Sequence, residues 1–355
     1  MALQGGEEDL TRSERVVAIG IGTGLTAVAA RVALGVPLDD PQISSIFDPV
    51  SPPAVAIYEL SLLVIGICTG IFLAVGGLLA YCVVRFRQRP GDDREPPQVY
   101  GSNQIELAWT VLPLIIVVVL FLVTTRTIIA VQNATPPSTA VNVTVVGHQW
   151  WWEFRYPDLG VVTANELHVP VSDATTRRPT MLALESADVI HSFWIPQLAG
   201  KTDLIPNRTN HMWIEPLKAG MYLGQCAEYC GTQHAKMLLR VIAHPPEEFD
   251  RWVAAQRQPA LLDAQAAHGR DVFLSTACIN CHRIGGTVAD GRFGPDLTHL
   301  MSRTTLGAGA AVNTPETLRA WIHNPDTLKP GANMPAMNLT GTELDAVVGY
   351  LATLR

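Results

Sequence analysis

The sequence predicts a multidomain protein: a transmembrane α-helical hairpin, then an all-β sandwich, then a helical domain. Two long uncharged runs, residues 60–84 and 107–125, indicate the hairpin. Short segments of alternating polarity, separated by turn residues, fill residues 140–243 and indicate an antiparallel sandwich. A helical pattern over residues 264–276 and a capped helix near the end of the chain indicate the last domain.

Composition limits the functions that this chain can have. Of its 355 residues, 48% are hydrophobic and only 16% are charged, which is typical of membrane segments joined to soluble domains. The net charge is -7 and no basic run is present, which excludes a nucleic-acid binder. Two of the six cysteines lie in an apolar run and the other four form two close pairs, so none is left for a structural disulfide.

Residues 1–38 fit either a signal peptide or an N-terminal signal anchor. Arg12 and Arg15 precede an uncharged run over residues 16–30, and Ala27-Val28-Ala29 is a small-residue cleavage pattern. The run can equally continue to Leu38 as an anchor.

The membrane hairpin is expected over residues 54–131. Its first run of 25 residues spans about 37 Å as a helix, enough for one crossing. Pro113 is placed near the start of the second span, where a proline is tolerated. The connecting loop RFRQRPGDDREPP carries four arginines, which places it in the cytoplasm and everything after Arg126 outside. Glu106 stands at the membrane border, where an acid is costly without water or a partner, so it is either a boundary residue or part of a site.

The stretch CAEYCGTQHAKM, residues 226–237, is the first motif that carries chemistry. Thiolates, imidazoles and a thioether are soft to borderline ligands that favour copper. Two cysteines four residues apart can bridge a pair of coppers, and His191 supplies a second imidazole from another strand. Zinc or a disulfide are the alternatives. The predicted ligands are His191, Cys226, Glu228 through its carbonyl, Cys230, His234 and Met237.

This stretch resembles the copper A (CuA) loop of cytochrome c oxidase subunit II, and GHQWWWEF, NELHVPV and KTDLIPNR extend the resemblance. The resemblance implies a cupredoxin-like fold for the all-β sandwich. It also implies that Trp150 receives electrons, that Glu106 lies at the mouth of a proton pathway, and that the Glu228 carboxylate binds magnesium shared with the catalytic subunit. The chain departs from the family at Trp151 and at Asn207, where asparagine tolerates positive φ.

Residues 244–262 are expected to be a linker that contains a short helix from Pro246 to Arg257. The domain that follows, residues 263–355, contains the second motif, Cys278-Ile279-Asn280-Cys281-His282. CxxCH is the attachment signature of c-type haem: the two thiols form thioether bonds and the imidazole binds iron. A thioredoxin-like redox pair is the alternative, but no βαβ pattern surrounds the motif.

The third domain resembles the class I cytochromes c, which implies an all-α fold and makes Met334 the sixth haem ligand. Gly294-Pro295-Asp296-Leu297 and the segment around Met334 carry this resemblance. Met301, Met337 and His299 are the rival ligands. Thr340 and Glu343 form a capping box that opens the final helix.

After about Asp48 the chain resembles subunit II of a caa-type cytochrome c oxidase. The resemblance implies electron flow from a donor, such as a cytochrome c or an upstream respiratory complex, to the haem, then to the dicopper centre, then to a catalytic subunit. The implied partners are haem-copper oxidase subunits I and III and membrane lipid, in a bacterial-type inner membrane. Dioxygen reduction needs an open metal site that this chain lacks, so no catalytic residue is expected in it. A free-standing dicopper and haem carrier serving another reductase is the alternative.

Overall fold

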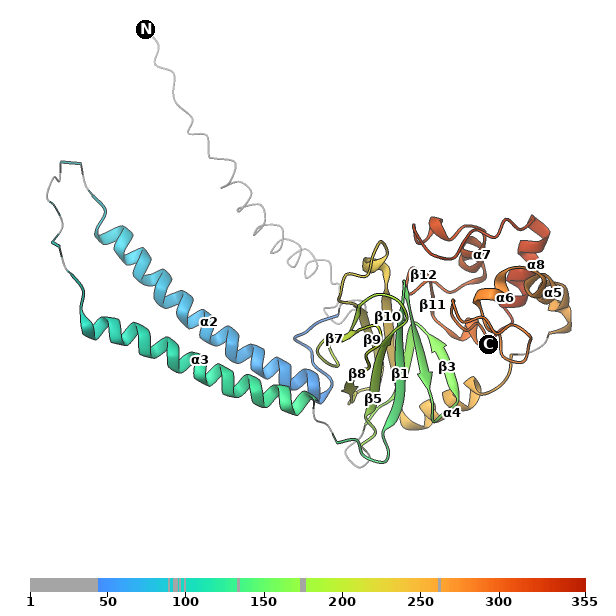
Figure 1. The fold of residues 1–355 in the computed structure, drawn as a ribbon, viewed down its shortest axis with the longest axis horizontal. Helices are drawn as coiled ribbons and strands as arrows, with labels where there is room; N and C mark the ends of the chain where they lie inside the picture. The colour runs from blue at the N-terminus through green and yellow to red at the C-terminus, as the bar shows by residue number, and fades with distance from the viewer. Residues whose placement is uncertain are drawn as a thin grey trace, which may run out of the picture. The chain divides into compact units, whose positions relative to one another are not determined.

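The computed structural model describes residues 44–88, 90–91, 95, 97–98, 100–132, 135–172, 177–260 and 263–355. The predicted signal peptide or anchor lies outside these residues. All the elements named below lie within residues 44–355 (Figure 1).

Two apolar helices form the predicted hairpin. Helix α2 runs from Pro52 to Arg85 and α3 from Asn103 to Gln132, and the two contact each other. Both are long and apolar enough to cross a membrane. Pro113 is inside α3 rather than in its first turn, so the expectation for this residue was wrong. The helix begins ten residues earlier, and the missing amide removes an internal hydrogen bond.

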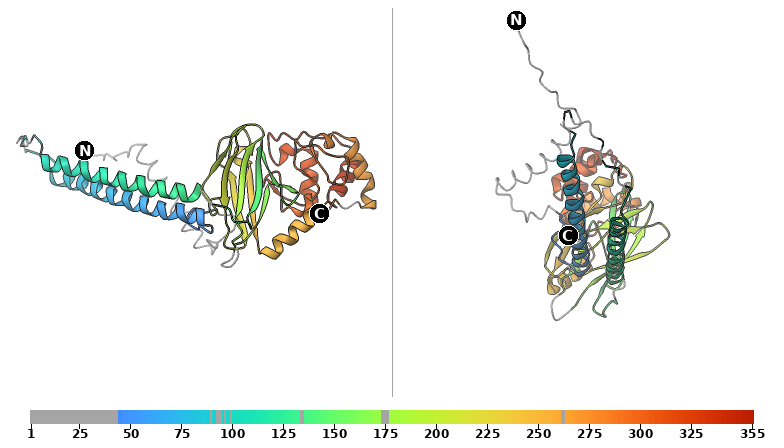
Figure 2. Two further views of the ribbon diagram at one scale, coloured as in Figure 1. Left: turned by 60° about the horizontal axis from the view of Figure 1, so that its bottom comes forward. Right: turned by 90° about the vertical axis from the view of Figure 1, so that its left-hand side faces the viewer.

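Two five-stranded sheets follow and pack face to face as a sandwich (Figure 2). The first has the order β3-β2-β1-β5-β8 and the second β4-β10-β9-β6-β7. The strands are β1 (Val141–His148), β2 (Trp151–Tyr156), β3 (Val161–Ala164), β4 (Glu166–Pro170), β5 (Thr180–Ser186), β6 (His191–Trp194), β7 (Thr202–Leu204), β8 (Asn210–Ile214), β9 (Gly220–Cys226) and β10 (Leu238–His244). Alternate residues of β5 and β10 are buried, as their period-two pattern predicts, whereas every residue of β4 is buried.

The hairpin between β1 and β2 carries the three consecutive tryptophans. Trp152 is fully buried on β2, whereas Trp150 lies in the turn before that strand. Across this hairpin, burial raises the pKa of the Glu153 carboxyl, but hydrogen bonds from His148 and Arg155 outweigh burial and lower it to about 2. Asn207 has a φ of 62°, within the positive range that asparagine tolerates.

The expected linker begins with an ordered helix, α4 (Pro246–Gln256), that packs against β3, β4 and β10 (Figures 1 and 2). Phe249 and Val253 are buried in the sandwich core, and the Trp252 ring stacks on His168 with centroids 4.2 Å apart. This helix therefore belongs to the sandwich rather than to a free connector.

The last domain is helical around its own core. Helix α5 packs on α8, and the capping box of Thr340 and Glu343 opens α8 as predicted. Its elements are η2 (Ala264–Ala266), α5 (Ala267–Ser275), α6 (Cys278–Cys281), η3 (Leu300–Ser302), β11 (Thr305–Leu306), β12 (Ala311–Val312), α7 (Pro315–His323), η4 (Pro325–Thr327) and α8 (Gly341–Leu351).

Candidate dicopper and haem sites

Strand pairing brings the predicted copper ligands together. Strands β6 and β9 are antiparallel neighbours in which Phe193 lies opposite Cys226. His191 at the start of β6 therefore lies close to the end of β9, although 35 residues separate it from Cys226. The loop after β9, with the short helix η1 (His234–Lys236), returns the remaining ligands to the same place.

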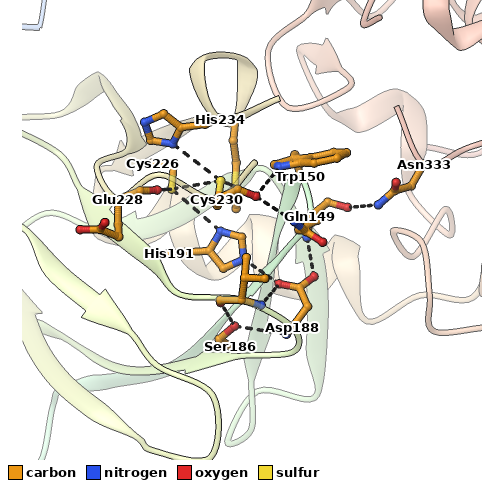
Figure 3. A network of polar contacts seen from close by, with 12 residues as sticks. Gln149, Trp150, Ser186, Asp188, His191, Cys226, Glu228, Cys230, His234 and Asn333 are labelled. Carbon is orange, nitrogen blue, oxygen red and sulfur yellow. Dashed lines mark hydrogen bonds and ion pairs between the residues drawn. The ribbon is translucent and has the colours of Figure 1, made fainter. Parts of the chain in front are cut away.

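The six predicted ligand atoms form one cluster (Figure 3). Cys226 Sγ lies 3.8 Å from Cys230 Sγ, 3.9 Å from His191 Nδ1 and 3.2 Å from the carbonyl oxygen of Glu228. Cys230 Sγ in turn lies 3.6 Å from His234 Nδ1 and 3.8 Å from Met237 Sδ. Each of the two cysteine sulfurs thus has one imidazole and one weak ligand beside it, an arrangement that suits a pair of soft metal ions.

The contact between the two thiols shifts their pKa values in opposite directions. A hydrogen bond from Cys230 lowers the pKa of the Cys226 thiol to about 3, and the same contact raises the pKa of Cys230. Both side chains are buried. A buried thiolate beside a second thiol is a ready cation site, and metal binding would release the remaining proton.

Asp188 orients the upstream histidine and was missed by the sequence reasoning. Its Oδ1 lies 2.8 Å from His191 Nε2, which leaves Nδ1 to face Cys226. The backbone N–H groups of Val189 and Gln149 also donate to this carboxylate, at 2.6 and 2.7 Å. An acid that fixes the tautomer of a ligating histidine is typical of metal sites, and its position three residues before His191 was the available signal.

The turn that carries Trp150 contacts the copper loop directly. Trp150 Nε1–H and the Gln149 side-chain amide both donate to the carbonyl oxygen of Cys230, at 2.9 and 2.8 Å (Figure 3).

The Glu228 carboxylate is exposed, and no group of candidate metal ligands in the described part of the chain includes it. The magnesium site gains no support from this geometry. Glu106 is exposed in the first turn of α3, and its role stays a prediction.

The CxxCH motif has the arrangement that a covalent haem needs. Cys278 and Cys281 lie on one helical turn, α6, and His282 follows it. His282 Nδ1–H donates to the carbonyl oxygen of Pro295 at 2.8 Å, which leaves Nε2 for iron. Burial lowers the pKa of His282 and so favours the neutral imidazole that binds metal. The buried Arg303 Nε has no hydrogen-bond partner in the described chain, as expected beside an anionic group such as a haem propionate.

Among the candidates for the sixth haem ligand, the structure favours Met334 over His299. Both ring nitrogens of His299 contact backbone carbonyl oxygens, those of Arg355 on one side and of Gln256 and Gln258 on the other. Met334 is half-buried against the core of the helical domain. Met301 packs against the same core, so the assignment of Met334 stays a prediction.

Three family models match the chain in order. They are the transmembrane domain of cytochrome c oxidase subunit II over residues 42–126, its periplasmic domain over 141–243, and cytochrome c over 266–355.

Full-length relatives cover most of the chain. Cytochrome c oxidase subunit 2 of Alkalihalophilus pseudofirmus is 36% identical over 317 residues, which is 87% of this chain and 90% of the relative. The same subunit of Bacillus sp. strain PS3 is 33% identical, covering 76% of this chain and 80% of the relative. Among solved structures, the periplasmic domain of cytochrome oxidase subunit II of Bradyrhizobium japonicum is 31% identical, with a TM-score of 0.32, covering 35% of this chain and 97% of that one.

The relatives and the three domain matches agree with the fold and with the two cysteine motifs. The chain belongs to the cytochrome c oxidase subunit II family, in the form that carries a fused cytochrome c domain, and is one subunit of an oxidoreductase complex.

Proposed function

We propose that this chain passes electrons from a covalent haem c to a dinuclear copper centre and on to the catalytic subunit that reduces dioxygen to water with proton translocation. The observation that carries the proposal is the convergence of six soft or carbonyl ligand atoms around Cys226 and Cys230, in a chain that also holds a CxxCH motif.

The proposal assigns a set of ligands to each cofactor. His191, Cys226, Glu228, Cys230, His234 and Met237 would hold the copper pair, and Cys278, Cys281, His282 and Met334 the haem. A dinuclear copper site and a haem with a thioether ligand supply reversible one-electron transfer. Dioxygen reduction itself is assigned in this proposal to a partner subunit.

The chain would sit in the bacterial inner membrane as a multi-pass protein, with the copper and haem domains on the outer side. Its partners would be the haem-copper catalytic subunit, subunit III and an external electron donor. Trp150 is the proposed point at which electrons reach the copper centre, because its indole N–H donates to the carbonyl of a copper ligand. Glu106 is proposed to open a proton pathway in the catalytic subunit.

Metal analysis of the native complex tests this function. Two coppers and one covalent haem in this chain are expected, in addition to the copper and haem of the large catalytic membrane subunit. Cys226→Ser should lose the copper pair, whereas Cys68→Ser, an exposed cysteine of α2, should keep it. Fewer than two coppers in the wild-type protein would overturn the dicopper assignment. A fully loaded chain that purifies alone would favour a free electron carrier.

A further inference from the structure

The contact between the haem domain and the sandwich is built from buried, specific interactions. Glu166 opens strand β4 of the sandwich and is fully buried. Its Oε1 accepts hydrogen bonds from the backbone N–H groups of Thr304 and Thr305, at 2.8 and 3.1 Å, and from the Thr304 hydroxyl at 2.6 Å. A fully buried oxygen that accepts three hydrogen bonds from another domain is a specific anchor rather than an incidental contact.

The loop that follows these threonines closes tightly on the sandwich. The backbone N–H of Leu238 donates to the carbonyl oxygen of Ala308 at 3.2 Å, and Ala308 is completely buried with Trp151 and Ala164. Gly309 has a φ of 86°, and a Cβ there would lie 3.1 Å from Leu238 Cβ. A side chain at Gly309 would therefore be strained by this backbone conformation and would press against Leu238.

A second segment of the haem domain lies on the turn beside the copper loop. The Lys329 amino group donates to the carbonyl oxygens of Trp150 and Gly307, at 2.8 and 2.9 Å. The Asn333 side-chain amide donates to the carbonyl oxygen of Gln149 at 2.8 Å (Figure 3). Gln149 in turn donates to the carbonyl oxygen of Cys230. Two hydrogen bonds thus join the residue before Met334 to a copper ligand.

We propose that Glu166 is a positioning residue for electron transfer: it holds the haem domain docked on the copper domain, so that Asn333 and Gln149 connect the two cofactor loops. The inference rests on the proposed function. It means that electrons pass between the haem and the copper pair without a swing of the haem domain.

The test uses the purified complex with both cofactors loaded. Hydrogen exchange of the wild-type protein comes first, because it needs no variant: the Leu238, Thr304 and Thr305 amides should be protected. Photo-induced reduction of the haem, followed optically at the copper, should give a transfer rate independent of solvent viscosity.

Glu166→Leu removes the acceptor of the Thr304 and Thr305 donors, but not that of the Leu238 amide. We expect exchange of the Thr304 and Thr305 amides to accelerate by about tenfold or more, and haem-to-copper transfer to slow and become viscosity-dependent. Glu166→Gln keeps an acceptor oxygen and should restore part of both signals. Glu247→Leu, at an exposed glutamate of α4, is the matched control and should match wild type.

Rapid exchange of these amides in the wild-type protein would overturn the docking. An unchanged, viscosity-independent rate in Glu166→Leu would overturn the role of Glu166. Absence of copper or haem from the wild-type complex would instead refute the proposed function, so the two failures are distinguishable.

Discussion

Replacement of Asp188 by asparagine tests how the copper site is held. The carboxylate accepts three N–H groups, from His191, Val189 and Gln149. An asparagine offers one oxygen, so its amide group must face at least one of these donors. Losing a charge-assisted hydrogen bond costs about 1.5–3 kcal/mol, which corresponds to a weakening of copper binding by about 10- to 100-fold.

The assay is competition for copper between the purified complex and a chelator, followed by copper absorbance, with the haem spectrum as an internal standard. Asp250→Asn is the matched control, because Asp250 is an exposed acid of α4 that pairs with Arg178 at 2.9 Å. Copper retention by Asp188→Asn within about twofold of wild type would refute the orienting role, given the range expected for such partners. Equal losses in both variants would refute it as well.

Three further predictions concern stability and docking. The lowered pKa of Glu153 means that the sandwich loses stability as pH falls from about 4.5 to about 2, and Glu153→Gln should flatten this loss in acid titrations followed by near-UV circular dichroism. Gly269→Ala should destabilise the haem domain by about 3 kcal/mol or more, because the new Cβ would lie 1.9 Å from a carbonyl oxygen of α8. In the control variant Gly349→Ala, at a glycine of α8 itself, the new Cβ would have no atom within 4 Å, so this change should be tolerated. Thermal unfolding of both variants tests the difference. Burial lowers the pKa of Lys329 to about 7, so the docked state binds fewer protons than the undocked state. Docking should therefore tighten as pH rises from about 7 to about 10. Hydrogen exchange of the Leu238 amide, corrected for the intrinsic exchange rate at each pH, measures this change.

The sequence was most informative where chemistry is local. Cys226, Cys230, His234 and Met237 lie within twelve consecutive residues, so their spacing alone predicts a soft-metal site. His191 could be proposed as a further ligand from its residue type, but its approach to Cys226 depends on the pairing of β6 with β9, which the sequence alone does not show. The two membrane helices were equally readable, since an uncharged apolar run of about 20 residues has the length that a bilayer crossing requires.

What the sequence did not predict depends on contacts between distant segments. Glu166 and Thr304 are 138 residues apart, and no periodicity or spacing links them. An aromatic run such as the one at Trp150 favours a strand, yet the chain turns there, between β1 and β2. Pro113 was placed near a helix end because α3 begins with polar residues that the uncharged run omits.

At helix α4 the boundary of the sandwich domain given by the family match differs from the boundary given by packing. The family match to the periplasmic domain ends at residue 243, yet Phe249 of α4 fills the interior of the sandwich. A recombinant fragment cut at residue 243 would expose the apolar surface that this ring covers, and such a patch promotes aggregation. A fragment extended to residue 256 would keep helix α4 over this apolar surface, and it is the one to express for copper-loading studies of the isolated domain.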